Sequence, residues 1–179
     1  MKVRELLDGH NPTAAWLATP AAQRLLRRLP VRRDLYKAIL TQTRDDRSAA
    51  QAFAPLARAL LPHEVRFRST DDRDPDDTDG NGFENIYQCA LVLFDVGQLV
   101  DVMPLYRAKL TDFDTGLGMD GEFLIGAGLR ATKEHVAKLA AAGEPRAADL
   151  LKYLGLMDDQ PARLEEWRAW RYRYHLGEE

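Results

Sequence analysis

The chain has 179 residues, of which 45% are hydrophobic and 30% are charged, and its formal net charge is -3. This length and composition predict one folded domain, residues 1–179, with a hydrophobic core of its own. The one cysteine, Cys89, excludes an intrachain disulfide and any zinc site built from several cysteines. Its apolar neighbours predict a buried, unreactive thiol.

The opening sequence MKVRELLDGH lacks the apolar region of a signal peptide. No apolar run approaches the ~18 residues that a membrane-spanning helix needs. We therefore expect a cytoplasmic protein that does not bind a membrane.

Charge is unevenly distributed along the chain. Residues 1–60 carry 11 Lys and Arg against 5 Asp and Glu, whereas residues 61–129 carry 5 against 14. Such segregation either steers a charged partner toward one pole of the molecule or reflects a coincidence of surface composition.

Helix signals follow one another closely at the start of the chain. Asn11-Pro12 and Thr19-Pro20 each place a capping residue before a proline suited to the first helical turn. Leu29-Pro30 ends the second of these helices. Apolar residues at helical spacing then predict a helix from Val31 to Leu40.

The next segment contains two internal prolines. A capping box at residues 48–51 predicts a helix that kinks or restarts at Pro55 and ends at Pro62. Residues 63–70 are expected to be extended.

Residues 71–79 read DDRDPDDTD, and a charge block of this density cannot be buried. We expect an Asp-rich loop near residues 69–82 that is solvated, binds a cation or meets a basic partner. Compared with a calcium-binding loop, positions one, three and five carry suitable oxygen ligands, but positions eight and twelve do not. The residues at these five positions are Asp77, Asp79, Asn81, Glu84 and Gln88. We therefore predict no dedicated metal site and no cofactor.

FENIYQCALVLF, residues 83–94, is apolar around most of the helical circumference, which predicts a central buried helix ended by Gly97. Asp101 is positioned to cap the next helix, which is expected to run to about Lys109.

Residues 110–128 form a glycine-rich connection in which we expect one short helix from Asp120. Gly116, Gly118 and Gly121 spell GxGxxG. A polar segment precedes them in place of the strand that a dinucleotide site requires, so these glycines are expected to permit tight turns.

Asp112, Asp114, Asp120 and Glu122 cluster around the same glycines. Paired carboxylates can perform acid–base or metal chemistry, and an enzyme of this kind would bring Asp114 and Glu122 together with Glu84. The structural alternative is that Asp120 caps a helix and that Asp112 or Asp114 bonds turn amides.

Further helices are expected at about 131–142, 145–155 and 161–175. In the last of them, Leu164, Trp167, Tyr174 and either Trp170 or Arg171 share one face, which predicts that the helix docks its tryptophans on the core. The aromatic and basic residues of this helix also suggest nucleic-acid binding, which the acidic composition disfavours.

The four histidines show no catalytic spacing, and we expect them at the surface. Five arginines in the first part of the chain form a basic patch that we expect to be solvated. These residues are His10, His63, His135 and His175, and Arg24, Arg27, Arg28, Arg32 and Arg33. Together, eight or nine short helices joined by tight turns predict an all-α array or bundle.

Residues 83–128 resemble a group of bacterial helical proteins that are encoded beside polymorphic toxin genes and act as cognate immunity proteins. The segments that carry the resemblance are FENIY at 83–87, RAK at 107–109, FDTG at 113–116 and GAG at 126–128. The resemblance implies a non-enzymatic protein that binds and neutralises a toxin enzyme, with no catalytic residue of its own.

An acidic surface facing a basic toxin site would raise the rate and specificity of such binding. The expected contact residues are Asp71, Asp72, Asp74, Asp76, Asp77, Asp79, Asp112, Asp114, Asp120 and Glu122. The alternatives are a small carboxylate-dependent enzyme and a regulatory or nucleic-acid-binding adaptor that uses the arginines.

Overall fold

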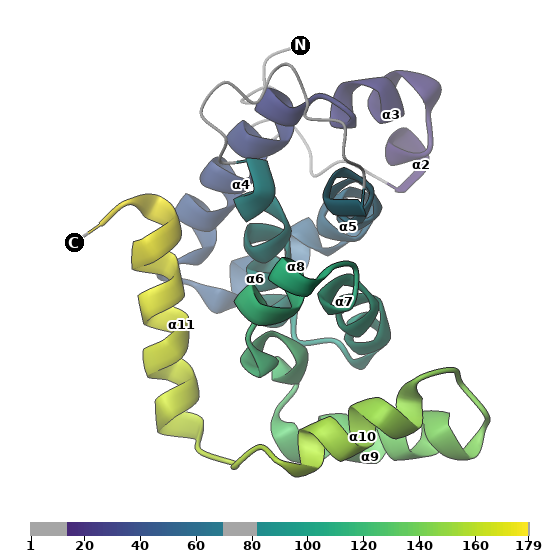
Figure 1. Ribbon diagram of the computed structural model, residues 1–179. Helices are drawn as coiled ribbons and strands as arrows, with labels where there is room; N and C mark the ends of the chain where they lie inside the picture. Colours follow the sequence, from purple (N-terminus) through teal and green to yellow (C-terminus); the bar gives the residue numbers. More distant parts are fainter. Residues whose placement is uncertain (1–13, 70–81, 179) are drawn as a thin grey trace.

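The structure, a computed structural model, describes residues 14–69 and 82–178 (Figure 1). Within these ranges every regular element is helical, with ten α-helices, eight of them seven residues or longer, and four 3-10 helices. The predicted all-α fold is therefore confirmed.

The first part of the chain forms α2 (Ala14–Leu17), α3 (Pro20–Leu26), α4 (Leu29–Thr43), η1 (Arg47–Phe53) and α5 (Ala54–Ser69). Thr19 caps α3 as expected, because its hydroxyl accepts a hydrogen bond from the Ala22 amide at 3.2 Å. The predicted capping box at 48–51 is wrong: Asp46 caps η1 by accepting the Ser48 amide at 2.9 Å.

Helix α5 continues through Pro62 to Ser69, so the expected helix end at Pro62 and the extended segment at 63–70 are both wrong. Pro62 lies on the exposed side of the helix, where water can bond the carbonyl that lacks its amide partner. The buried side continues past the proline, from Leu60 to Glu64. This buried side outweighs the local effect of the proline.

Helix α6 (Asn85–Val96), preceded by η2 (Gly82–Glu84), is buried around nearly its whole circumference, as the sequence predicts. It ends at Gly97, whose φ of 63° lies in the left-handed region that favours glycine. It runs through the middle of the molecule and packs against α4, α5, η1 and η4 (Gly121–Ile125) (Figure 1). It is therefore the helix around which the others assemble.

Helix α6 is followed by η3 (Leu99–Asp101), α7 (Val102–Lys109), α8 (Phe113–Gly118) and then η4. Asp101 does not cap α7 with its side chain, which instead binds Arg58 of α5 through two hydrogen bonds of 2.6 and 2.8 Å. Helix α8 contradicts the expected turn between Leu110 and Asp120. Asp112 stabilises its first turn by accepting the Thr115 amide at 2.8 Å.

The chain ends in α9 (Leu129–Ala141), α10 (Ala147–Gly155) and α11 (Pro161–Leu176). Helices α9 and α10 lie side by side as a hairpin, and α11 runs back along α4 and α6 (Figure 1). All three lie within two residues of their predicted positions.

A contiguous cluster of buried apolar side chains extends from Leu17 to Tyr172. Cys89 belongs to this cluster, is 0% exposed and donates its thiol proton to the Ala57 carbonyl at 3.3 Å. The expected burial of Cys89 is therefore confirmed, and that burial raises the pKa of its thiol well above the usual value. In the described parts of the chain no helix is both long and apolar enough to span a lipid bilayer.

Helix α11 is attached to the core by aromatic packing and by a buried polar network. The Trp167 ring meets Phe94 and Phe123 edge to face, at centroid distances of 5.1 and 4.8 Å. Arg168 donates two hydrogen bonds of 2.7 and 2.8 Å to Asp95 of α6. Tyr172 donates a third to the same carboxylate at 2.5 Å. This attachment decides which side chains α11 presents to solvent.

Candidate protein-binding surface

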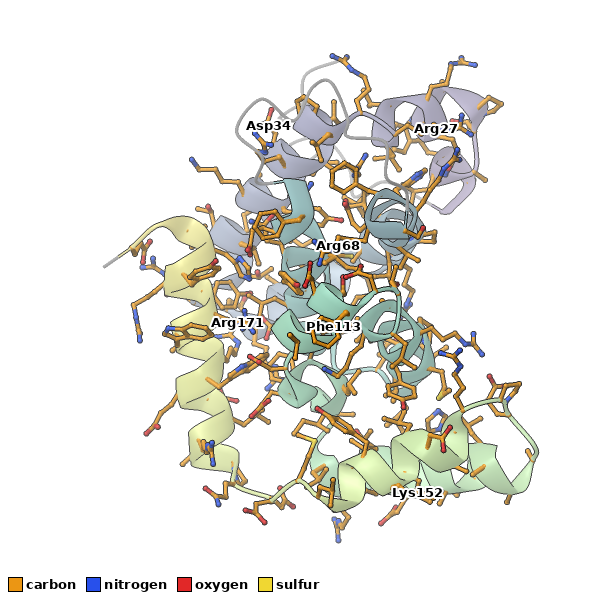
Figure 2. The ribbon with its side chains drawn as sticks, in the orientation of Figure 1. Arg27, Asp34, Arg68, Phe113, Lys152 and Arg171 are labelled. Atoms are coloured by element: carbon orange, nitrogen blue, oxygen red, sulfur yellow. The ribbon has the colours of Figure 1, made fainter. Side chains whose placement is uncertain are left out.

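An open cleft of about 590 Å³ lies between α5, η2, α6, α8 and α11. We call it the aromatic cleft, because Phe83, Leu117, Trp170 and Tyr174 line it and are 38%, 69%, 46% and 52% exposed. Phe113, which is 78% exposed, is on the same short helix as Leu117 and is labelled in Figure 2. Large apolar side chains thus gather at one surface.

The attachment of α11 explains why its aromatic residues reach the cleft. Residues three or four apart share a helix face, so Arg168 and Tyr172, which both bind Asp95, define the inward face of α11. Trp170 and Tyr174 are each two residues from one of these and therefore lie on the opposite, outward side. Arg171 is 6% exposed, and the Trp170 and Tyr174 rings stack at 5.8 Å. The expectation that both tryptophans of this helix dock is therefore right for Trp167 and wrong for Trp170.

Two arginines of the cleft are paired within the protein. Arg68 of α5 donates to the Thr115 hydroxyl at 2.7 Å and to Asp112 at 3.4 Å. Arg171 donates to Asp120 and to the Gly118 carbonyl. In Figure 2 these two arginines lie on different sides of α8. Both fix the position of α8, because their partners lie in it or at its ends.

Glu84 and Asp114 are two carboxylates of the cleft. Among the described residues, no Lys or Arg lies within salt-bridge distance of either of them. Glu84 accepts the Tyr174 hydroxyl at 3.2 Å, and burial raises the pKa of Glu84 despite that bond and the nearby arginines. With both arginines neutralised by Asp112 and Asp120, the cleft offers apolar surface with a surplus of negative charge.

The predicted contact residues have different locations. Asp114 and Asp120 line the aromatic cleft, and Asp112 lies at its edge, paired with Arg68. Glu122 does not belong to this group, because it lines a separate pocket of about 200 Å³ beside the start of α11. The roles of cap and turn residue are divided differently from the expectation: Asp112 caps α8, whereas Asp120 makes no capping bond and accepts the Trp167 indole at 2.7 Å.

The six aspartates of the acidic segment, Asp71, Asp72, Asp74, Asp76, Asp77 and Asp79, lie outside the described residues, as does most of the calcium-like pattern. The described chain on both sides of the segment borders the cleft, because Arg68 and Phe83 line it.

The carboxylate enzyme requires Glu84, Asp114 and Glu122 in one pocket, and the structure brings together only the first two. Among the described residues no three His, Cys, Asp or Glu side chains are placed to hold a metal ion.

Two expectations about basic residues are wrong. Arg32 is 2% exposed and is not on a solvated face, because it donates to Glu64 at 2.6 Å and to the carbonyls that end α3. His175 is not a surface residue: its side chain is 1% exposed. Burial, reinforced by the Arg171 charge, lowers the pKa of His175 to about 3.

The residues that dominate the aromatic cleft are Leu117, Trp170 and Tyr174, which the sequence analysis did not select as contacts. Helical spacing within 161–175 does not separate Trp170 from Trp167, because residues three apart share a face. Leu117 carries no signal either, because its helix α8 has only six residues, which are too few for an apolar repeat.

The fold and this surface define an all-helical protein with a candidate binding cleft. Comparisons of the chain with models of known protein families, with curated proteins and with solved structures give no match.

Proposed function

We propose that this chain is a non-enzymatic binding protein that recognises a protein partner through the aromatic cleft. The observation that carries the proposal is the group of exposed aromatic and apolar side chains around Leu117 and Trp170. Contiguous exposed apolar surface is unfavourable in water and is typical of sites that bind other proteins.

The composition of the cleft supports a protein in preference to a small molecule. Tryptophan and tyrosine are enriched among the residues that dominate binding energy at protein interfaces, and each buries a large area with few rotatable bonds. Trp170 and Tyr174 are also pre-ordered by their mutual stacking at 5.8 Å. A partner therefore loses less conformational entropy when it binds them.

Charge favours a basic partner. The cleft contributes Glu84 and Asp114 as carboxylates, and residues 71–79, which follow Arg68 in the sequence by only a few positions, add six more. Opposite charge accelerates association and penalises wrong partners. The proposed partner is a toxin enzyme with a basic active-site surface, as the resemblance of residues 83–128 implies, and the proposed location is the cytoplasm.

The test is neutralisation of the adjacent gene's product. The product is expressed with and without this chain, and growth of the host is measured. The proposal predicts rescue of growth by the wild-type chain and an equimolar complex on size-exclusion chromatography. If the product shows no toxicity, or if toxicity persists although the chain is folded and abundant, the toxin partner is wrong.

Charge reversal tests the predicted acidic contacts separately. Replacing Asp74, Asp76 and Asp77 together by lysine is expected to slow association and to reduce the affinity for the same product, more strongly at low salt. Unchanged association by the triple variant removes the acidic segment from the interface and leaves the aromatic cleft to be tested on its own.

A further inference from the structure

A second cavity shares Glu84 and Tyr174 with the aromatic cleft and lies where α4, α6 and α11 converge. Its volume is about 470 Å³, within the usual range of small-ligand sites. The described residues that line it include Arg33 and Lys37 of α4, Asn85 and Gln88 of α6, and His175 of α11. We call this cavity the polar pocket.

The polar pocket concentrates unsatisfied hydrogen-bonding atoms. Seven buried side-chain nitrogen or oxygen atoms have no hydrogen-bond partner in the described part of the chain, and four of them belong to residues that line this pocket. The four are Glu84 Oε2, Asn85 Nδ2, Gln88 Oε1 and His175 Nε2. Buried polar atoms are almost always satisfied, so these four bind either water or a ligand.

Burial distinguishes this site from an ordinary polar surface. Asn85 is 1% exposed, and so is the side chain of His175. Asn85 and Gln88 are three residues apart and therefore share the face of α6 that meets α11. Polar side chains held this firmly by a helical scaffold are oriented before a ligand arrives, which lowers the entropic cost of binding.

Three of the atoms call for a donor with positive charge. Glu84 Oε2 and Gln88 Oε1 are acceptors, and neutral imidazole can accept at Nε2. The imidazole of His175 is neutral at physiological pH, because burial and the Arg171 charge lower its pKa to about 3. An ammonium group has three N–H donors, one for each of these acceptors.

The other groups call for an acceptor with negative charge. Asn85 Nδ2 is a donor, and Lys37 supplies an exposed ammonium on the α4 wall. A phosphate or sulfate would satisfy these two but would meet the carboxylate of Glu84. A simple amine would satisfy the acceptors but would leave Asn85 unpaired and face Lys37.

We propose that the polar pocket binds a free α-amino acid, with its ammonium group on Glu84, Gln88 and His175 and its carboxylate on Asn85 and Lys37. This ligand complements all four unsatisfied atoms at once. The proposal does not rest on the proposed protein partner, because it is argued from the unsatisfied atoms of this cavity, although the two sites share Glu84 and Tyr174.

Isothermal titration calorimetry of the full chain tests the proposal, with each of the twenty common α-amino acids as probe. Butylamine and butyrate serve as probes that carry only one of the two charged groups. At least one amino acid is expected to bind with a submillimolar dissociation constant. Both single-group probes are expected to bind at least about 10-fold more weakly, because each lacks charged hydrogen bonds.

Two variants connect that binding to the pocket. Gln88→Leu, at a half-buried position, and Lys37→Met, at an exposed one, should each weaken binding of the best amino acid by about 10-fold or more. Lys152→Met, at a lysine whose side chain is 82% exposed and lies outside the pocket, is the control and should bind normally. The nitrogen chemical shifts of the His175 imidazole should move when the amino acid is added to the wild-type chain.

Three results would overturn the proposal. No heat from any amino acid at tens of millimolar would mean that the pocket holds only water. Butylamine binding as tightly as the best amino acid would assign the pocket to a cation, such as a lysine side chain of another protein. Binding that survives both pocket variants would place the amino acid elsewhere on the molecule.

Discussion

Gly126 leaves almost no space for a single added carbon. A Cβ atom there would lie 2.1 Å from the Phe94 carbonyl oxygen, at the end of α6. The obstacle is backbone, so it cannot rotate away. Arg47 reinforces the contact by donating to the carbonyls of Phe94 and Gly126 at 3.2 and 2.9 Å.

Gly126→Ala is therefore expected to destabilise the protein by about 1–3 kcal/mol, the usual cost of overpacking, through displacement of η4 from α6. Urea denaturation measures the effect. Gly155→Ala is the matched control, because nothing lies within 4 Å of its added Cβ and alanine favours the helical end of α10. An equal loss in both variants would refute the close contact.

Asp112 connects α8 to α5 and is expected to stabilise the fold as well as to border the cleft. Burial opposes its charge, but hydrogen bonds from Thr115 and the charge of Arg68 hold the pKa of Asp112 below its usual value. A depressed pKa means that the folded state favours the ionised form. The stabilisation is thus present above the unfolded pKa of about 3.9 and is lost as pH falls through the lower folded pKa.

Asp112→Ala should cost about 1 kcal/mol at pH 7, as expected for loss of a helix cap, and the difference from wild type should shrink as pH falls below 4. Thermal unfolding followed by circular dichroism across this pH range provides the measurement. Asp114→Ala, at an exposed position in the same short helix, should be nearly neutral. A cost that stays constant into acid would show that the charge of Asp112 is irrelevant.

At the scale of elements, a helix is predictable from the sequence when local residue spacing determines it, and is missed when tertiary contacts do. Helix α6 was predicted because its apolar spacing is continuous from Phe83 to Phe94. The end of α5 was missed because Pro62 is a strong local signal, whereas the buried contact of Glu64 with Arg32 that extends the helix depends on the tertiary structure. Helix α8 was missed because it has six residues, two of them glycine.

The candidate site was predictable only in part for the same reason. Carboxylates are conspicuous in a sequence, so Asp114 and Asp120 were selected, and both do line the cleft. The proximity of Leu117 to Trp170, 53 positions apart by their numbers, exists only because α11 folds back along α6. No periodicity within either helix encodes that contact.

The attachment of α11 depends on Asp95, whose side chain is 0% exposed. Asp95→Asn keeps the size of the side chain but leaves Arg168 without its buried counter-charge. We expect a loss of about 3–5 kcal/mol, the typical cost of breaking a buried ion pair, and earlier exchange of the α11 amides in hydrogen-exchange measurements.

Asp149→Asn provides a matched control for this prediction. Asp149 lies 3.9 Å from Lys152, and their side chains are 68% and 82% exposed. Surface pairs of this kind contribute little, so stability should hardly change. Equal effects of the two substitutions would contradict the claim that the Asp95 network attaches α11.

At the scale of the whole molecule, part of the uneven charge distribution forms ion pairs within the protein. Three arginines of the basic first third bind carboxylates of the acidic middle: Arg32 with Glu64, Arg47 with Asp95, and Arg58 with Asp101. Much of the segregation along the sequence therefore serves to join α4, η1 and α5 to later elements. It does not all remain available to steer a partner.

Fewer of the expected acidic contact residues are free to meet a partner than the sequence predicts. Arg68 and Arg171 are occupied by Asp112 and Asp120, which removes these two carboxylates from the acidic surface as well. The described cleft presents chiefly apolar area, and Glu84 and Asp114 are among the residues that line it. Affinity should thus depend more on the aromatic residues than on any one aspartate.

The most direct test of protein binding through the aromatic cleft is calorimetric titration of the adjacent gene's product into wild type, Leu117→Glu and Val100→Glu. Leu117 and Val100 are 69% and 62% exposed, so both glutamates should be tolerated by the fold, but only Leu117 lines the cleft. We predict a weakening of about 30-fold or more for Leu117→Glu, and no change for Val100→Glu. Equal affinity of all three proteins would contradict the assignment of this surface, and absence of binding by the wild-type chain would contradict the proposed function itself.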